Sequence, residues 1–151
     1  MLISLLRIFK IIQIRFCRCL PCFNIWKRPL EWRISLKFSL STRPDCIRQD
    51  YLEAFQNFRE RTGIEVSIEL GLQTVNYHTL SAMNRGHGLA EFINAVLLIA
   101  PYHFPVCVHM ILNLPGDAME DARESARVLS ALPVSMVKVT FFIYSKGMCI
   151  I

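Results

Sequence analysis

The sequence has no apolar run long enough to cross a membrane. Its apolar N-terminal stretch, residues 1–16, is interrupted by Arg7, Lys10, Gln13 and Arg15, and a spanning helix needs roughly 18 continuous residues. The same polar residues break the apolar core that a secretory signal peptide requires, and no small-residue cleavage site follows. We therefore expect neither a spanning helix nor a secretory leader.

The main part of the chain also lacks an excess of basic residues. Residues 1–33 contain seven Lys/Arg and one acid, whereas residues 34–151 contain ten basic and eleven acidic residues. Binding to phosphate backbones needs clustered positive charge, so the main part gives no nucleic-acid signal. Residues 1–33 form a basic apolar leader, which we expect to lie outside the core. Its alternative role is weak contact with a membrane surface through one helical face, formed by Leu2, Leu5, Leu6, Phe9 and Ile12.

Motifs of several common enzyme classes are missing. No Walker-type loop, no Ser-His-Asp signature and no GxGxxG after a strand occurs in the sequence. Nothing therefore supports hydrolase or nucleotidyl-transfer chemistry. The cysteines do not suggest a disulfide framework either, because Cys46, Cys107 and Cys149 lie singly in or beside apolar stretches. Such thiols are expected to be reduced, as in a cytoplasmic protein.

What the sequence does contain is a regular alternation of strand and helix patterns. Apolar residues with a period of two predict strands at about residues 34–41, 65–70, 105–112 and 135–144. Helical patterns are predicted at about residues 48–61, 76–85, 89–100 and from 117 to Pro133. The expected caps and stops are Asp45 or Asp50, Gly63, Asn76, Gly86 and Asp117, the last in a capping box with Glu120. The last helix is expected to bury Met119, Ala122, Ala126 and Leu129.

This order predicts one α/β domain with parallel strands. Ligands in such folds bind at the carboxyl ends of the strands. The polar strand faces carry Ser39, Glu69, His109 and Thr140, which a barrel would direct into its interior. Together with Gln73 and Arg43 or Arg85, they would suit a polar, zwitterionic, nucleoside-like ligand.

Each of these residues also has a purely structural interpretation. Glu69 could be a core carboxylate paired with Arg43 or Arg85, and His109 a buried core histidine. Gln73 and Arg85 could simply tie a loop to a helix end. The sequence pattern alone leaves both interpretations open.

Six short motifs occur in a fixed order along the chain. They are TRPDC (42–46), ELGLQ (69–73), NRGH (84–87), HMILNLPGD (109–117), VK (137–138) and KG (146–147). With this order and spacing, the sequence resembles a mostly bacterial family near the elongator-type radical S-adenosylmethionine (radical SAM) enzymes. The resemblance covers about residues 34–148.

The resemblance implies a six-unit open (β/α) barrel, of which residues 34–151 would supply about four βα units, the third to the sixth. It implies that Gln73 and Arg85 contact the ribose and the methionine moiety of S-adenosylmethionine, that Glu69 lies beside them, and that His109 faces the adenosyl end. The implied cofactors are S-adenosylmethionine and a [4Fe–4S] cluster. The cluster cleaves S-adenosylmethionine reductively to a 5′-deoxyadenosyl radical, and the substrate is left open.

The chain also departs from the family pattern. The cluster is expected on a C-x-x-x-C-x-x-C loop, whereas Cys17, Cys19 and Cys22 form C-x-C-x-x-C. They also lie about twenty residues before TRPD, without room for the family's second strand. Asn113 replaces a glycine of the family, and Asp117 a glutamate.

Three interpretations of the cysteines remain, namely chance in an unrelated leader, cluster ligation, or another metal such as zinc. We expect a partial radical SAM core, a fragment that is inactive as it stands and ends before the family's C-terminal region. The alternative is a non-catalytic membrane-surface or partner-binding module that uses residues 1–33.

Overall fold

The computed structural model describes residues 37–143. Expectations for the leader, for Cys17, Cys19 and Cys22, and for Cys149 therefore fall outside the described residues. The described part contains a four-stranded parallel sheet with the strand order β1-β2-β3-β4. The strands are β1 (Lys37–Thr42), β2 (Glu65–Gln73), β3 (Val106–Leu112) and β4 (Met136–Phe141). The predicted α/β class with parallel strands is confirmed.

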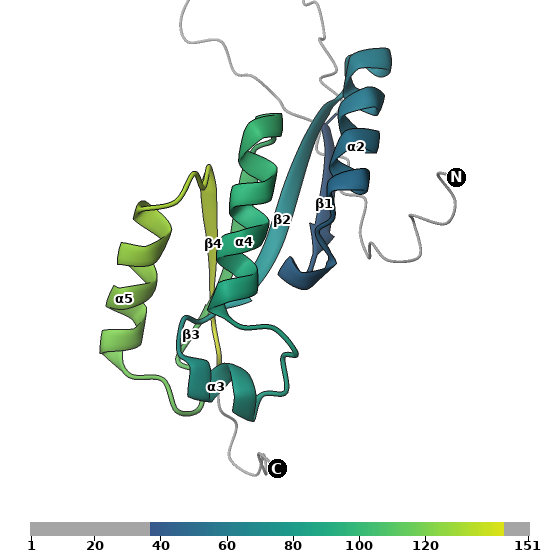
Figure 1. The fold of residues 1–151 in the computed structure, drawn as a ribbon. Coiled ribbons are helices and arrows are strands. Elements are labelled where there is room, and N and C mark those ends of the chain that lie inside the picture. The colour runs from purple at the N-terminus through teal and green to yellow at the C-terminus, as the bar shows by residue number, and fades with distance from the viewer. Residues whose placement is uncertain (1–36, 144–151) are drawn as a thin grey trace, which may run out of the picture.

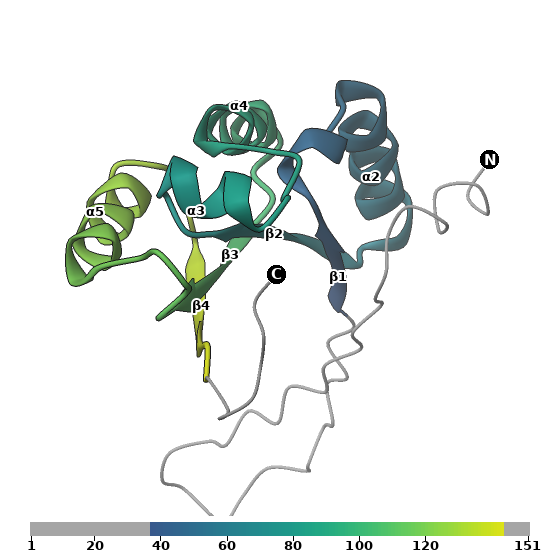
Figure 2. The ribbon, with the colours of Figure 1, turned by 90° about the horizontal axis from the view of Figure 1, so that it is seen from below.

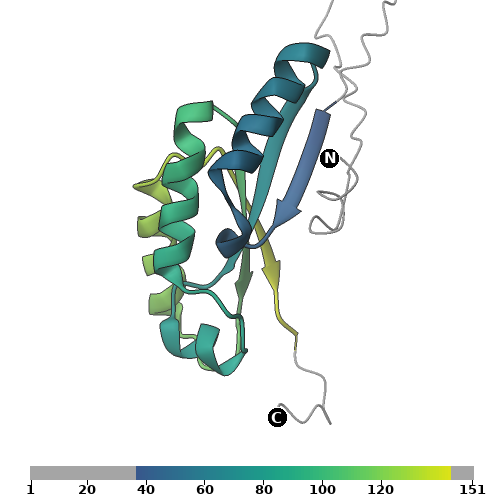
Figure 3. The same ribbon diagram turned by 45° about the vertical axis from the view of Figure 1, so that its right-hand side comes forward.

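Helices cover one face of this sheet. The long helices α2 (Gln49–Thr62), α4 (Leu89–Ile99) and α5 (Met119–Ser130) connect successive strands and lie together on the same side (Figures 1 and 2). The short helix α3 (Tyr77–Ala82) follows β2 at the end of the sheet where the strands finish. Two 3-10 turns, η1 (Pro44–Cys46) and η2 (Ala100–Tyr102), complete the connections. In the side view of Figure 3, the long helices lie on one side of the sheet, and its other face points away from them.

The hydrophobic core fills the space between the sheet and these helices. Alternate residues of β2 point into it, as the period-two pattern requires, and all are almost fully buried: Val66, Ile68, Leu70 and Leu72. Helix α4 supplies the central knobs Phe92, Val96 and Ile99 from the opposite side. Each fully buried apolar side chain of this kind stabilises the fold by roughly 1.5–3 kcal/mol relative to its exposed state.

Two of the predicted helix caps are wrong. Helix α2 begins after Arg48 without a side-chain cap, because Asp45 and Asp50 instead pair with Arg43 and Arg48. The capping box of α5 is shifted by one residue, so that the Asp121 carboxylate accepts from the Ala118 N–H at 2.7 Å. Asp117 accepts from the Thr79 hydroxyl instead. The expected stop of α2 at Gly63 is confirmed by its left-handed conformation, with φ +69°.

The inner face of α5 also differs from the prediction. Leu129 is buried as predicted and Ala122 is half-buried, whereas Met119 is 67% exposed and Ala126 is exposed; the buried place on this face is taken by Ser125. Ser125 can be buried because its hydroxyl donates to the Asp121 carbonyl. A groove of about 520 Å³ separates α5 from β4, so the edge strand keeps Val137 and Val139 partly exposed.

The loops at the carboxyl end of the sheet are fixed by left-handed residues. Asn113 has φ +63° and donates from Nδ2 to the Phe142 carbonyl at 2.9 Å. This position needs a residue that tolerates positive φ, which asparagine does better than most non-glycine residues. Helix α3 ends at Ala82 rather than at Arg85, and the left-handed Asn84 and Gly86 follow. Arg85 therefore lies on the loop after the helix. No helix within residues 37–143 is long and apolar enough to cross a membrane.

The cap of α3 gives a first test of the fold. Asn76 accepts hydrogen bonds from the His78 and Thr79 N–H groups at 3.0 and 3.2 Å. We expect Asn76→Ala to lower the free energy of unfolding by about 1 kcal/mol, measured by urea denaturation. The matched control is Asn57→Ala on an exposed position inside α2, where alanine is the better helix former. Equal losses for both variants would contradict the capping role.

Candidate functional site

A single carboxylate organises the sheet face opposite the helices. Glu69 Oε1 accepts from Ser39 Oγ at 3.0 Å and from Lys138 Nζ at 2.6 Å. Glu69 Oε2 accepts from Ser41 Oγ at 3.1 Å and from His109 Nε2 at 2.8 Å. Because these donors come from β1, β3 and β4, one side chain on β2 links all four strands.

This environment keeps Glu69 ionised. Burial alone would raise its pKa, since a buried charge is costly. The hydrogen bonds from Lys138, His109, Ser39 and Ser41 outweigh that effect and lower the pKa of Glu69 from 4.5 to about 2. The alternative in which Glu69 pairs with Arg43 or Arg85 is wrong, because its ion-pair partner is Lys138 and its other oxygen accepts from His109.

Lys138 is a functional candidate that the sequence pattern does not single out. In the sequence it is only part of the VK motif, although the alternation in β4 places it on the same face as Thr140. Thr140 itself donates to the Met110 carbonyl and does not contact Glu69. The signal that could have identified Lys138 was an unpaired carboxylate on the polar face of β2, which needs a cation on a neighbouring strand.

The carboxyl end of β2 carries a second group of polar residues around Gly71. The register with β3 shifts between Gly71 and Gln73, and Gln73 has a φ of +77°. A Cβ atom on Gly71 would lie 2.7 Å from Gln73 Nε2 and 3.4 Å from the Arg85 guanidinium. A larger residue at this position would force the Gln73 amide to move away from its present place, whereas glycine accommodates both side chains as they lie. The side chains of Gln73 and Arg85, both predicted site residues, thus lie together next to Gly71.

His87 forms a hydrogen bond to the backbone of the same residue, Gly71. Its Nε2 lies 2.9 Å from the Gly71 carbonyl oxygen, so Nε2 must carry the proton and donate. Burial is the main reason that the pKa of His87 is lowered, and the residue is 7% exposed. The sequence pattern indicates no role for His87, although it is the last residue of the NRGH motif.

Two buried polar atoms in this group have no hydrogen-bond partner within the described part of the chain. They are Arg85 Nε and His87 Nδ1. A buried donor or acceptor without a partner costs roughly 1–3 kcal/mol, and native structures keep few of them. Arg85 thus retains one free donor, and the neutral His87 ring retains one free acceptor. Both can be satisfied by a bound polar ligand or by water.

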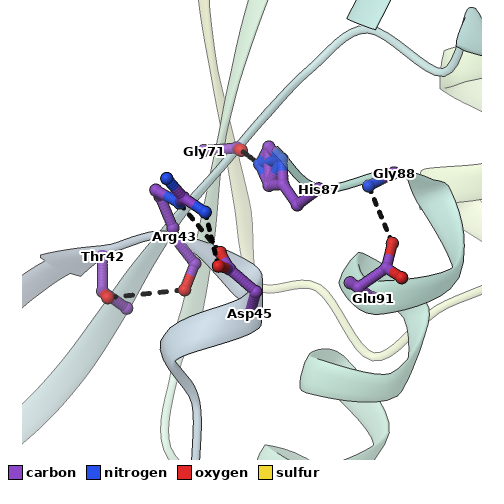
Figure 4. A network of polar contacts seen from close by, with 7 residues as sticks. All are labelled: Thr42, Arg43, Asp45, Gly71, His87, Gly88 and Glu91. Carbon is purple, nitrogen blue, oxygen red and sulfur yellow. Dashed lines mark hydrogen bonds and ion pairs between the residues drawn. The ribbon is translucent and has the colours of Figure 1, made fainter. Parts of the chain in front are cut away.

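The TRPD segment completes the edge of the site. Arg43 donates from Nε to Asp45 Oδ1 at 2.9 Å and from a terminal nitrogen to Oδ2 (Figure 4). This pairing raises the pKa of Arg43 and lowers the pKa of Asp45. The Arg43 guanidinium also lies against Gly86, beside Arg85. Its charge is therefore already matched, in contrast to Arg85, whose buried Nε has no partner among the described residues.

The site therefore has two adjoining parts on β2. The first, called the Glu69 hub, comprises Ser39, Ser41, Glu69, His109 and Lys138. The second, called the Gly71 edge, comprises Gly71, Gln73, Arg85 and His87. They adjoin because Gly71 is the register partner of His109. The arrangement offers a guanidinium and an amide at the edge and a hydrogen-bonded imidazole behind them, a set that suits a polar ligand carrying a carboxylate and hydroxyl groups.

The low pKa of Glu69 predicts a pH-dependent contribution to stability. A carboxylate whose pKa falls on folding stabilises above its unfolded pKa, and this contribution is lost as the pH falls toward its folded value. We expect Glu69→Gln to lower the free energy of unfolding by about 3 kcal/mol at pH 7, and the difference from wild type to shrink between about pH 4.5 and pH 2.

The matched control for this prediction is Glu65→Gln on the same strand. Glu65 pairs with Lys37 on the surface, with both side chains about half exposed or more, so its loss should cost less than about 1 kcal/mol at any pH. Urea titrations between pH 7 and pH 3 measure both variants. A Glu69→Gln effect that does not change with pH would contradict the assignment.

The architecture is similar to that of two solved structures. One is the archaeal Elp3 of Methanocaldococcus infernus, with a TM-score of 0.59 and 23% identity over 74% of this chain and 26% of that chain. The other is coproporphyrinogen III oxidase (HemN) of Escherichia coli, described as a radical SAM enzyme, with a TM-score of 0.61 and 16% identity over 73% of this chain and 24% of that chain. At these identities the likeness shows the fold alone.

Curated relatives match at higher identity. They include protein MJ0486 of Methanocaldococcus jannaschii, 33% identical over 82% of this chain and 38% of its own length. Protein YtqA of Bacillus subtilis is 33% identical over 72% of this chain and 33% of its own length. Protein YhcC of Escherichia coli is 35% identical over 57% of this chain and 28% of its own length. The chain thus spans about a third of the length of these relatives.

A family model gives the direct assignment. The model described as "Radical SAM superfamily" matches residues 27–129, which is more than half of the chain. The match includes β1 to β3 and nearly all of α5, and therefore Glu69, Gln73, Arg85 and His109. The chain belongs to the radical SAM superfamily.

Proposed function

We propose that residues 37–143 form the S-adenosylmethionine-binding wall of a radical SAM core. The observation that carries this proposal is the Gly71 edge, where Gln73 and Arg85 lie over one glycine and Arg85 Nε and His87 Nδ1 lack partners. A left-handed glutamine is an unfavourable conformation, and such conformations are concentrated at functional sites. The unsatisfied atoms and the strained backbone both favour a ligand at this edge.

The residues present fit S-adenosylmethionine. Arg85 supplies a guanidinium that can bind the methionine carboxylate, and Gln73 supplies an amide that can bind the ribose hydroxyls, as the family resemblance implies. Glu69 and His109 stand beside them, with His109 held by its hydrogen bond to Glu69. His87 acts as a positioning residue, because its bond to the Gly71 carbonyl fixes the backbone that presents Gln73. When bound beside a [4Fe–4S] cluster, S-adenosylmethionine supplies a 5′-deoxyadenosyl radical in this family.

We further propose that the chain, as it stands, binds S-adenosylmethionine without cleaving it. Within residues 37–143 the cysteines are Cys46 and Cys107, and three thiolates are needed to hold the family's cluster. Cys17, Cys19 and Cys22 offer C-x-C-x-x-C, a spacing that differs from the C-x-x-x-C-x-x-C of the superfamily.

Binding can be tested without any redox chemistry. We expect the full chain to bind S-adenosylmethionine in isothermal titration calorimetry, and Arg85→Ala to weaken binding by about 10- to 100-fold, because a charge-assisted hydrogen bond contributes roughly 1.5–3 kcal/mol. Gln73→Ala should weaken it less, since its contact is neutral. The control is Arg61→Ala, an exposed arginine in the last turn of α2, which should bind as wild type. Equal affinities for Arg85→Ala and Arg61→Ala would overturn the proposal.

Cleavage needs a separate experiment. After anaerobic reconstitution with iron and sulfide and reduction with dithionite, we expect no 5′-deoxyadenosine from the full chain, measured by liquid chromatography. The iron and sulfide content should equal that of a Cys17→Ser, Cys19→Ser, Cys22→Ser variant. Production of 5′-deoxyadenosine by the full chain, lost in the triple variant, would refute the inactivity proposal and assign the cluster to these cysteines.

A further inference from the structure

Three potential metal ligands meet on the polar face of the sheet, beside the Glu69 hub. A carboxylate oxygen of Glu69, the sulfur of Cys107 and a ring nitrogen of His109 all lie within 4.8 Å of one another. Glu69 and Cys107 are register partners on β2 and β3, and His109 follows Cys107 by two residues, so its side chain lies on the same face. From this juxtaposition we propose a second, mononuclear site that takes a borderline divalent metal ion such as Zn²⁺.

The chemistry of the three donors selects this class of ion. Thiolate and imidazole together are typical of Zn²⁺ sites, and one carboxylate is a common third ligand. With Zn–S of about 2.3 Å and Zn–N or Zn–O of about 2.0–2.2 Å, tetrahedral ligand atoms lie roughly 3.2–3.8 Å apart. Because the three atoms are already within 4.8 Å, small rotations of the side chains would reach that geometry. One cysteine cannot hold an iron–sulfur cluster, so this site differs from the family's cluster site.

Each oxygen of Glu69 has its own hydrogen-bond partners, and this division favours a metal ion on Oε2. Oε1 accepts from Ser39 and Lys138, whereas Oε2 accepts from Ser41 and His109. A metal ion on Oε2 would replace the proton that now lies between Oε2 and His109 Nε2. The Lys138 ion pair on Oε1 would remain in place. Binding would also release the proton of the Cys107 thiol, because only the thiolate is a ligand.

The hydrogen-bonding environment would help to orient the ligands. Ser39, Ser41 and Lys138 hold the carboxylate, in the way that outer partners fix ligand orientation in known metal sites. Cys107 is 7% exposed, and His109 is partly exposed, with 37% of its side-chain surface accessible. The ion would therefore reach the site from the His109 side, where the fourth coordination position can take water.

The test uses Co²⁺ as a spectroscopic probe in the full chain. Cys17, Cys19, Cys22 and Cys149 are first replaced by serine, which removes thiols outside the described residues. We expect one equivalent of Co²⁺ to bind and to give a thiolate-to-cobalt charge-transfer band in the near ultraviolet. The band should disappear on addition of Zn²⁺, which should also raise the melting temperature through its binding to the native state.

Two further substitutions locate the site. In the same background, Cys107→Ser should abolish the charge-transfer band, whereas the matched control Cys46→Ser should leave it unchanged. Absence of the band before these substitutions, or its persistence in Cys107→Ser, would overturn the proposal. If circular dichroism shows that Cys107→Ser does not fold, His109→Gln is used instead, because it keeps the thiol. This variant should weaken Co²⁺ binding by at least about tenfold. An unchanged affinity would likewise overturn the proposal. No S-adenosylmethionine is present, so failure here leaves the proposed function standing.

Discussion

The buried carboxylate of Glu69 is the interaction on which the polar face of this sheet depends. An ionised carboxylate with 9% exposure is costly unless it is fully hydrogen-bonded, and here four donors from three other strands surround it. Removal of any one of these donors would leave the negative charge of Glu69 less well compensated. The face opposite the helices is therefore held together by one saturated anion, while the opposite face is held by ordinary apolar packing.

The two faces meet at the carboxyl end of β2. Leu72 is fully buried beneath the helices, whereas Gly71 and Gln73, on either side of it, carry the polar edge. The register shift between these two residues and the positive φ of Gln73 locally distort the strand. Tight packing of Leu72 on one side and the His87 bond to Gly71 on the other hold this distortion in place. The core thus provides the stability that a strained edge requires.

Much of this arrangement follows from the sequence through short-range rules. The order of strands and helices, the stop at Gly63 and the Asn76 cap each depend on local periodicity or on a single residue type. The partners of Glu69 do not, because Lys138 is 69 residues away and only the parallel register places it there. The caps of α2 and α5 were misassigned for a similar reason. Asp45 and Asp117 are suitable cap residues, but Arg43 and Thr79 offered them partners that the linear pattern did not indicate.

The departures from the family motifs become intelligible at the same edge. Asn113, where the family resemblance leads us to expect glycine, has a left-handed conformation, and its amide donates to the Phe142 carbonyl. Asp117 keeps an acid at the position of the family's glutamate, where its carboxylate joins the loop after β3 to Thr79 on α3. In this structure, both side chains therefore make contacts within the fold. Within the described residues, the buried side-chain atoms that have no hydrogen-bond partner, Arg85 Nε and His87 Nδ1, lie at the Gly71 edge rather than in the Glu69 hub, and we therefore propose that ligand recognition depends on this edge.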